Sequence, residues 1–249
     1  MNTEIRNPSD ELLDYTYTES TPQPPFSDWL VILGHGLTGD KDRPIIVDAS
    51  QALSEAGFNT LSFSYAGNGN SEGRFEDATI SKEAKDLESV INAVSDSYKN
   101  IAYLGHSMGG AVGLLQSSRD TRIKALISIA GMVNTKLFAE TEFADVVPDK
   151  DVMWEEPDCP LSSSFMDDLC NTHRNFSDNI EKIGVPWLLI HGTEDDVVLP
   201  QDSRTVKTIR GDQVDFQELE GVNHVFDSPQ HMSDMTTRVV SWLRNIASR

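Results

Sequence analysis

The stretch from Ile101 to Gly110 constrains the fold of this chain more than any other. A short apolar run, I-A-Y-L, is followed by G-H-S-M-G-G and then by an apolar, helix-like segment over residues 111–116. The pattern G-x-S-x-G between a strand and a helix is typical of a sharp, strained turn that lifts a serine hydroxyl off the end of a sheet. Glycine at the two outer positions removes Cβ atoms that would crowd the turn. Ser107 is therefore the candidate nucleophile. The alternative is an ordinary Gly/Ser turn that matches the same sequence pattern.

The rest of the chain alternates predicted strands with predicted helices. Apolar or alternating runs predict strands at 29–33, 60–65, 101–104, 123–130, 186–190 and 214–219, and apolar stripes predict helices at 44–56, 80–94, 111–116, 203–209 and 232–246. Such alternation predicts an α/β fold with a mostly parallel central sheet, right-handed crossovers and helices on both faces. We expect one domain over residues 1–249. Residues 1–20 are expected to form a β-hairpin around the turn cluster N-P-S-D at 7–10.

One block, residues 132–183, interrupts this alternation. Its periodicity is weak, and it carries several aromatic side chains among many acidic ones. A segment this long between two strands is usually a functional insertion. We expect a lid or cap over the C-terminal edge of the sheet, with a pair of ordinary packing helices as the alternative.

A serine nucleophile needs a base, and the base needs an orienting acid. After a turn of this kind the partners are expected in the order acid then histidine, each behind a later strand. Asp195 in G-T-E-D-D-V-V follows the fifth predicted strand, and His224 in G-V-N-H follows the last one. We therefore expect His224 to be the general base and Asp195 to orient its imidazole. Asp196 and, after it, Glu194 are the rival acids.

The negative oxygen of a tetrahedral intermediate needs backbone N–H donors. Met108, the residue after the nucleophile, is expected to supply one. The other should come from an early strand-to-helix loop, and H-G-L-T-G at 35–39 is that loop. We expect the N–H of Leu37 to be this second donor, and His35 to brace the loop rather than to act as a base.

These motifs together resemble the α/β-hydrolase superfamily, in order and over nearly the whole chain. They are H-G-x-x-G at 35–39, G-H-S-M-G-G at 105–110, G-T-x-D-x-x-V at 192–198 and G-x-x-H at 221–224. Within the superfamily, the loop at 35–41 and G-x-G-x-S-E-G at 67–73 are similar to small serine esterases near the cinnamoyl/feruloyl esterases and monoacylglycerol lipases. The resemblance implies a lid over an acyl pocket for residues 132–183. Many cinnamoyl esterases have Gln where this chain has Met108. The expected oxyanion donor at this position is the backbone N–H, so a different side chain does not remove it.

The residues and the resemblance together predict a serine carboxylic-ester hydrolase (EC 3.1.1.-). It would act through Ser107, Asp195, His224 and an acyl-enzyme on small acyl or aromatic-acid esters, without a cofactor. Trp154, first among the aromatic residues of the insertion, is expected to line the substrate pocket. A thioesterase, a peptidase and a C–C bond hydrolase are the alternatives within the superfamily. A non-catalytic binding protein of the same fold is disfavoured, because no triad residue is missing.

Charge narrows the classes of partner. The chain has 20 Lys and Arg against 40 Asp and Glu, a formal net charge of −20. Such a surface repels phosphate backbones and anionic membranes, which disfavours nucleic acid as a partner. A small-molecule ester is the expected partner, and the sequence leaves a homodimer open.

The cysteines, the N-terminus and the histidines predict the remaining properties. Two cysteines, Cys159 and Cys170, are too few for a disulfide framework and favour reduced thiols. We find no apolar signal segment and no run long enough for a membrane span, so a cytoplasmic protein is expected. The six histidines lack metal-ligand spacing, which predicts no metal site. The glycines at 67–73 suggest a dinucleotide loop, but R-F-E-D separates them from the next helix, which disfavours that interpretation.

Overall fold

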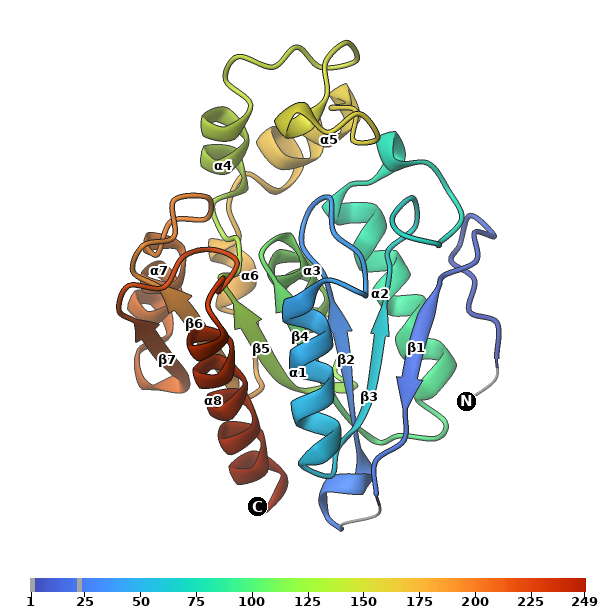
Figure 1. Cartoon of the computed structure of the whole chain (residues 1–249), viewed down its shortest axis with the longest axis vertical. Coiled ribbons are helices and arrows are strands. Elements are labelled where there is room, and N and C mark those ends of the chain that lie inside the picture. Colours follow the sequence, from blue (N-terminus) through green and yellow to red (C-terminus); the bar gives the residue numbers. More distant parts are fainter. Residues whose placement is uncertain (1–2, 22–23) are drawn as a thin grey trace.

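The computed structural model describes residues 3–21 and 24–249. Its sheet has seven strands in the order β1-β3-β2-β4-β5-β6-β7, and the neighbours are parallel except for β1 and β3 (Figure 1). The strands are β1 (Tyr15–Thr18), β2 (Trp29–Gly34), β3 (Asn59–Phe63), β4 (Asn100–His106), β5 (Ile123–Ile129), β6 (Trp187–Gly192) and β7 (Val214–Leu219). The helices are α1 (Pro44–Glu55), α2 (Ile80–Val94), α3 (Met108–Ser117), α4 (Thr135–Glu142), α5 (Ser163–Asp167), α6 (Ser177–Ile180), α7 (Gln201–Arg210) and α8 (Pro229–Ala247).

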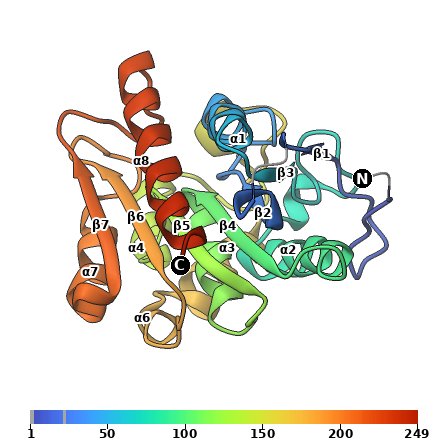
Figure 2. The ribbon, with the colours of Figure 1, turned by 90° about the horizontal axis from the view of Figure 1, so that it is seen from below.

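Helices cover both faces of the sheet, as the view from below shows (Figure 2). Successive residues of β2 belong to opposite apolar clusters, because side chains alternate between the two faces of a strand. Leu30 and Ile32 share a cluster with residues of α2 and α3, whereas Val31 and Leu33 share one with α1 and α8. Burial on both faces explains why this strand is a continuous apolar run.

The predicted α/β fold with a mostly parallel sheet is confirmed. Each predicted strand and helix is present, with boundaries that differ by a few residues; the last helix, for example, begins at Pro229 behind a Ser228 cap. The N-terminal hairpin is only partly present. One antiparallel bridge, Arg6 with Leu12, spans the expected turn, and the chain beyond it pairs as β1 with β3. The first two residues of the predicted hairpin lie outside the described residues.

Most of the segment 132–183 lies beyond the carboxyl ends of the parallel strands, whereas its last helix, α6, packs beside α3 and α7 (Figure 1). It contains α4, α5, α6 and a π-helical turn, Asp168–His173. Its first residues are tied to α7, because Asp202 accepts hydrogen bonds from the N–H groups of Val133 (2.6 Å) and Asn134 (2.9 Å). Asp168 ties it to α2 by accepting from the N–H of Ser81 at 3.1 Å.

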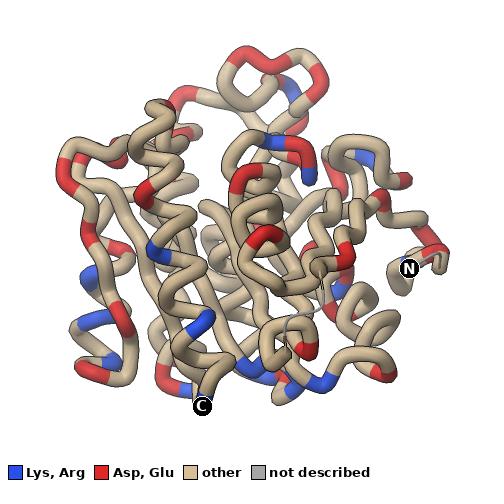
Figure 3. Tube along the Cα trace, turned by 60° about the horizontal axis from the view of Figure 1, so that its bottom comes forward, with Lys and Arg blue, Asp and Glu red and all other residues tan. Residues whose placement is uncertain are grey.

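The acidic positions are spread over loops and helices around the molecule rather than gathered in one patch (Figure 3). None of the helices within residues 3–21 and 24–249 combines the length and the apolarity that a membrane crossing requires.

Candidate active site

Ser107 lies in the turn between β4 and α3, with φ 54° and ψ −119°. A non-glycine residue at positive φ is strained, and such strain persists only where neighbours hold it. Here the N–H of Ser107 donates to Ile129, and its carbonyl accepts from Gly110 and Met132. Glycine is required at position 105, because a Cβ there would lie 2.2 Å from the carbonyl oxygen of Gly109. The local structure is the turn that the sequence pattern predicts.

Three side chains from separate loops meet at this turn. The Nε2 atom of His224 lies 3.0 Å from the Oγ of Ser107, and its Nδ1 lies 2.8 Å from Oδ2 of Asp195. Asp195 follows β6 and His224 follows β7, so the sheet brings their loops together at one edge. The three residues are 5% (Ser107), 3% (Asp195) and 9% (His224) exposed. This arrangement can transfer a proton from the serine hydroxyl to an imidazole whose other nitrogen faces a carboxylate.

The structure distinguishes Asp195 from the two rival acids. Its neighbours Glu194 and Asp196 are exposed, whereas Asp195 is buried. Its Oδ1 accepts hydrogen bonds from the N–H groups of Val197 (3.0 Å) and Val198 (2.9 Å). Burial alone would raise the pKa of Asp195, but contacts with His191 and His224 outweigh it and hold the pKa well below its usual range. The carboxyl group beside His224 is therefore an anion.

The two predicted oxyanion donors flank the serine. Within the described part of the chain, no acceptor is hydrogen-bonded to the N–H of Leu37 or of Met108. Met108 is the first residue of α3, where backbone N–H groups have no partner inside the helix. Leu37 and Ser107 line the same cavity. Both N–H groups are thus free to bind an oxyanion.

His35 holds the peptide group that carries the N–H of Leu37. The Nε2 of His35 accepts a hydrogen bond from the N–H of Tyr65 at 3.1 Å, so Nδ1 carries the proton and donates to the Gly36 carbonyl at 2.8 Å. The same carbonyl accepts from the N–H of Gly39 at 3.0 Å. Burial lowers the pKa of His35 to about 4, so the ring stays neutral. The geometry agrees with the bracing role expected for His35.

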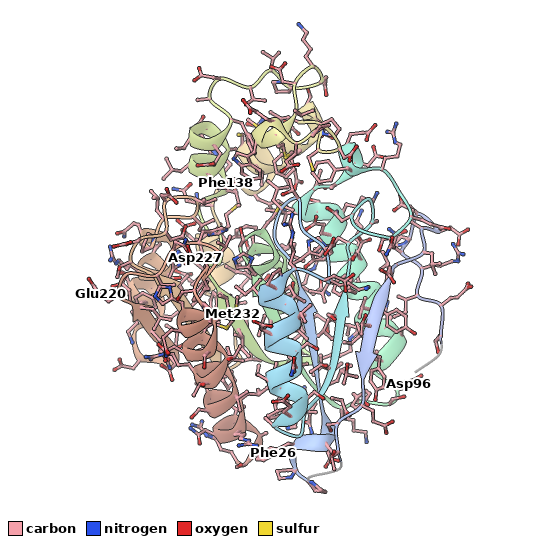
Figure 4. The ribbon with its side chains drawn as sticks, viewed as in Figure 1. Phe26, Asp96, Phe138, Glu220, Asp227 and Met232 are labelled. Atoms are coloured by element: carbon pink, nitrogen blue, oxygen red, sulfur yellow. The ribbon has the colours of Figure 1, made fainter. Side chains whose placement is uncertain are left out.

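A cavity of about 650 Å³ opens over Ser107. Its lining is largely apolar and comes from the loop after β2, the start of α1, the loop before α8 and the insertion. Phe138 of α4 lies on the insertion side of this cavity, and Asp227 and Met232 lie near the start of α8 (Figure 4). Apart from its histidines, the ionisable residues of the lining are Arg43 and Asp227.

Trp154 also lines this cavity, so the structure brings it to the same space as Ser107. Its side chain is 41% exposed, and its indole N–H donates to Glu142 at 3.0 Å. Its ring packs against Phe143 at 5.3 Å and Phe138 at 6.4 Å between centroids. These contacts hold the indole at the cavity wall with one part facing solvent.

Sequence reasoning missed two histidines at this site, His106 and His191. The Nε2–H of His106 donates to the backbone carbonyl of His224 at 3.0 Å, and the two rings lie 4.9 Å apart. His191 Nε2 lies 3.2 Å from Oδ2 of Asp195. His106 ends β4 and His191 is next to last in β6. In the sequence each follows the end of a predicted strand by one or two residues, and that position was the available signal.

Other predicted features have simpler structures. Cys159 and Cys170 are free thiols, and burial raises the pKa of both. Across residues 3–21 and 24–249, no group of three or more His, Cys, Asp or Glu is placed to hold a metal ion. The glycine loop at 67–73 is followed by a 3₁₀ turn before α2, and Glu72 in this loop contacts Arg6 and the N–H of Leu12. This loop packs against the N-terminal segment.

A strained serine turn between strand and helix, with an acid and a histidine behind later strands of a parallel sheet, defines an α/β-hydrolase. The predicted superfamily is therefore confirmed. The chain belongs to the prolyl oligopeptidase family, whose sequence profile matches residues 47–249. A curated relative from Escherichia coli, an uncharacterized 31.7 kDa protein in the traX-finO intergenic region, is 31% identical over 103 residues. That match covers 40% of this chain and only 36% of the relative.

Several solved structures share the fold over almost the whole chain. Est1E from Butyrivibrio proteoclasticus, with ferulic acid bound, is 23% identical with a TM-score of 0.84 and full coverage of both chains. The esterase Pf2001 from Pyrococcus furiosus is 20% identical with a TM-score of 0.76, covering 98% of this chain and 89% of its own. Mouse alpha/beta hydrolase domain-containing protein 10 is 18% identical with a TM-score of 0.72 and covers 98% of both. At these identities the likeness shows the fold.

Proposed function

We propose that this protein is a serine carboxylic-ester hydrolase for esters of small acyl or aromatic acids. The observation that carries the proposal is the hydrogen-bonded series from Ser107 through His224 to Asp195, at the base of a largely apolar cavity. An apolar cavity with a few polar groups at one point suits an uncharged acyl group whose reactive carbonyl is polar.

In the first half-reaction the Oγ of Ser107 attacks the ester carbonyl carbon while its proton passes to Nε2 of His224. The imidazolium that forms is stabilised by the anionic carboxylate of Asp195, which accepts from Nδ1. The tetrahedral intermediate collapses as His224 returns the proton to the departing alcohol oxygen. The products of this half-reaction are the free alcohol and an ester of Ser107.

In the second half-reaction a water molecule attacks the acyl-enzyme carbonyl and gives a proton to His224. Collapse of the second intermediate returns that proton to the Oγ of Ser107 and releases the carboxylic acid. In both intermediates the oxyanion accepts from the N–H groups of Leu37 and Met108. Loss of one such donor typically costs roughly 3–4 kcal/mol of transition-state stabilisation.

Residues 132–183 are proposed to form a lid within a single domain of residues 1–249. Supporting this, Phe138 and Trp154 reach from the insertion into the cavity that holds Ser107. The aromatic wall favours a flat or aromatic acyl group, and stacking on such rings adds to apolar burial. Ferulic acid, which is bound in the Est1E structure, is an acid of this type.

A substrate panel on wild type and Ser107→Ala tests this proposal. The panel contains p-nitrophenyl acyl esters, methyl ferulate, a monoacylglycerol, an acyl-thioester and an aminoacyl anilide. We expect turnover of the oxygen esters by wild type and its loss in Ser107→Ala. Unchanged turnover in the variant would contradict the mechanism, and turnover of no member would favour a non-catalytic binding protein.

A peptidase is the second candidate, because the family name refers to oligopeptide cleavage. The same three residues can attack an amide, with His224 protonating the amine as it leaves. Cleavage of the anilide in preference to every ester would favour this candidate. Preference for the acyl-thioester would instead favour a thioesterase.

A further inference from the structure

We propose that His191 is a positioning residue that acts on the reaction through Asp195, and that Ser203 supports it by donating to its other ring nitrogen. This inference rests on the proposed function, because it assigns the support of the same catalytic acid. The series of contacts would then extend beyond Asp195, through His191, to a second buried serine.

The contacts form a continuous series through the protein interior. On one side of Asp195, His224 leads to Ser107. On the other side, Nε2 of His191 lies 3.2 Å from Oδ2 of Asp195, and Nδ1 of His191 lies 2.8 Å from the Oγ of Ser203. His191 is 0% exposed and Ser203 is 1% exposed. Side chains this deeply buried have their orientation set by protein contacts alone.

The partners of His191 define which of its two ring nitrogens carries the proton. Nε2 is 2.8 Å from the backbone carbonyl oxygen of Val198, and a carbonyl can only accept a hydrogen bond. Nε2 therefore carries the proton, and Nδ1 accepts from the hydroxyl of Ser203. This places the N–H of His191 against the carbonyl of Val198 with the Asp195 carboxylate beside it.

His191 consequently holds the loop after β6, which carries Asp195, at two points. The loop closes on itself, because Oδ1 of Asp195 accepts from the N–H groups of Val197 and Val198. His191, which is fixed on β6, then binds the carbonyl of Val198 and faces Oδ2 of Asp195. Its N–H dipole stabilises the charge on Oδ2, the oxygen that also accepts from His224.

Other titratable groups face this pair, and none of them replaces His191. From β4, the neutral ring of His106 lies against His224. From α7, the carboxylate of Asp202 lies near His191 and Asp195 but accepts from the backbone of Val133 and Asn134. Among the described residues, His191 is therefore the side chain, besides His224, that supports the carboxylate of Asp195.

Two amide variants separate positioning from packing. In His191→Gln the amide nitrogen reaches the place of Nε2 and can donate both to the Val198 carbonyl and to Asp195. In His191→Asn the shorter side chain reaches only the place of Nδ1, beside Ser203. We expect His191→Gln to keep kcat for a p-nitrophenyl ester within roughly 3-fold, and His191→Asn to lower kcat roughly 10- to 100-fold with little change in KM.

The pH profile gives the readout that a merely structural role would not move. Without the His191 donor, Asp195 becomes a stronger base and holds a proton on His224 more firmly, so the acid limb of kcat/KM should move to higher pH in His191→Asn. Ser203→Ala, which leaves Nδ1 of His191 without its donor, should move the acid limb in the same direction by less. His231→Gln, on the partly exposed start of α8, is the control and should leave both kcat and the limb unchanged.

An unmoved acid limb in His191→Asn, or equal loss in the Gln and Asn variants, would overturn the proposal while leaving the esterase proposal standing. A thermal unfolding curve for each variant checks that the protein is folded at the assay temperature, so that the kinetics compare folded enzymes. Retained activity in Ser107→Ala would instead overturn the proposed function itself.

Discussion

The Nδ1 atom of His35 lies 2.8 Å from the carbonyl oxygen of Gly36, in the peptide group whose N–H belongs to Leu37. Because a trans peptide is planar, its carbonyl and its N–H point in opposite directions. Holding the Gly36 carbonyl on one side therefore fixes the Leu37 N–H on the other. A buried, neutral histidine thus sets the direction of the proposed oxyanion donor.

This relationship predicts the effect of His35→Phe, which keeps an aromatic ring beside Tyr65 but has no N–H. We expect kcat to fall roughly 10- to 100-fold with little change in KM, because an oxyanion donor acts mainly on the transition state. Steady-state kinetics with a p-nitrophenyl ester measures this. A rise in KM at constant kcat would show that His35 supports substrate binding rather than the oxyanion.

The acid is tested by comparing two adjacent substitutions. Asp195→Asn should lower kcat by about 10⁴-fold, since an amide in place of the anion favours the wrong tautomer of His224. Asp196→Asn removes a carboxylate of the same type from an exposed position and should stay within about 3-fold. The reverse order of activities would exchange the two assignments.

The buried ring of His106 predicts a loss of stability in acid. Burial lowers its pKa to about 3, whereas an unfolded histidine titrates near ~6.5. Below the unfolded value the unfolded chain binds a proton that the folded ring does not, so the free energy of unfolding falls as pH drops. As the pH drops from about 6.5 to about 4, the free energy of unfolding should fall in both proteins. We expect the fall to be about 3 kcal/mol smaller for His106→Phe than for wild type.

Urea unfolding of both proteins across this pH range measures the difference. Parallel curves for wild type and His106→Phe would mean that the folded ring of His106 takes up a proton as readily as the unfolded one.

The aromatic wall of the cavity predicts a selective effect of Trp154→Ala. We expect kcat/KM for methyl ferulate to fall roughly 10-fold and that for a p-nitrophenyl acetate to change much less, because only the larger acyl group reaches the indole. Leu137→Ala is the matched control, since Leu137 is an exposed apolar residue of the insertion that lies outside the cavity lining. Equal losses for both substrates would place Trp154 outside the acyl site.

The residues that sequence reasoning located are those fixed by strand ends. Ser107, Asp195 and His224 each follow a strand, and parallel strands bring their carboxyl ends to one edge of the sheet. Trp154 was predicted to line the pocket, but its place in the fold was not predicted. The insertion has no hydrophobic periodicity from which to infer the path of the chain. The predicted N-terminal hairpin was only partly correct. β1 pairs with the edge of β3 over four residues, whereas a single bridge forms across the predicted turn.

His191 could not be given a role from the sequence. A histidine at a strand end has the same local pattern whether it faces the core or a carboxylate. Its neighbours Asp195 and Ser203 belong to a loop and a helix that only the folded chain places around it.

The central claim is that Ser107 is a nucleophile activated by His224, and covalent labelling tests it most directly. A fluorophosphonate reacts with an activated serine in the same way as an ester, and intact-mass spectrometry followed by peptide mapping locates the adduct. We predict one adduct, on Ser107, formed rapidly by wild type, greatly slowed in His224→Ala and absent in Ser107→Ala. An adduct on another residue, or an equal labelling rate in His224→Ala, would contradict the account.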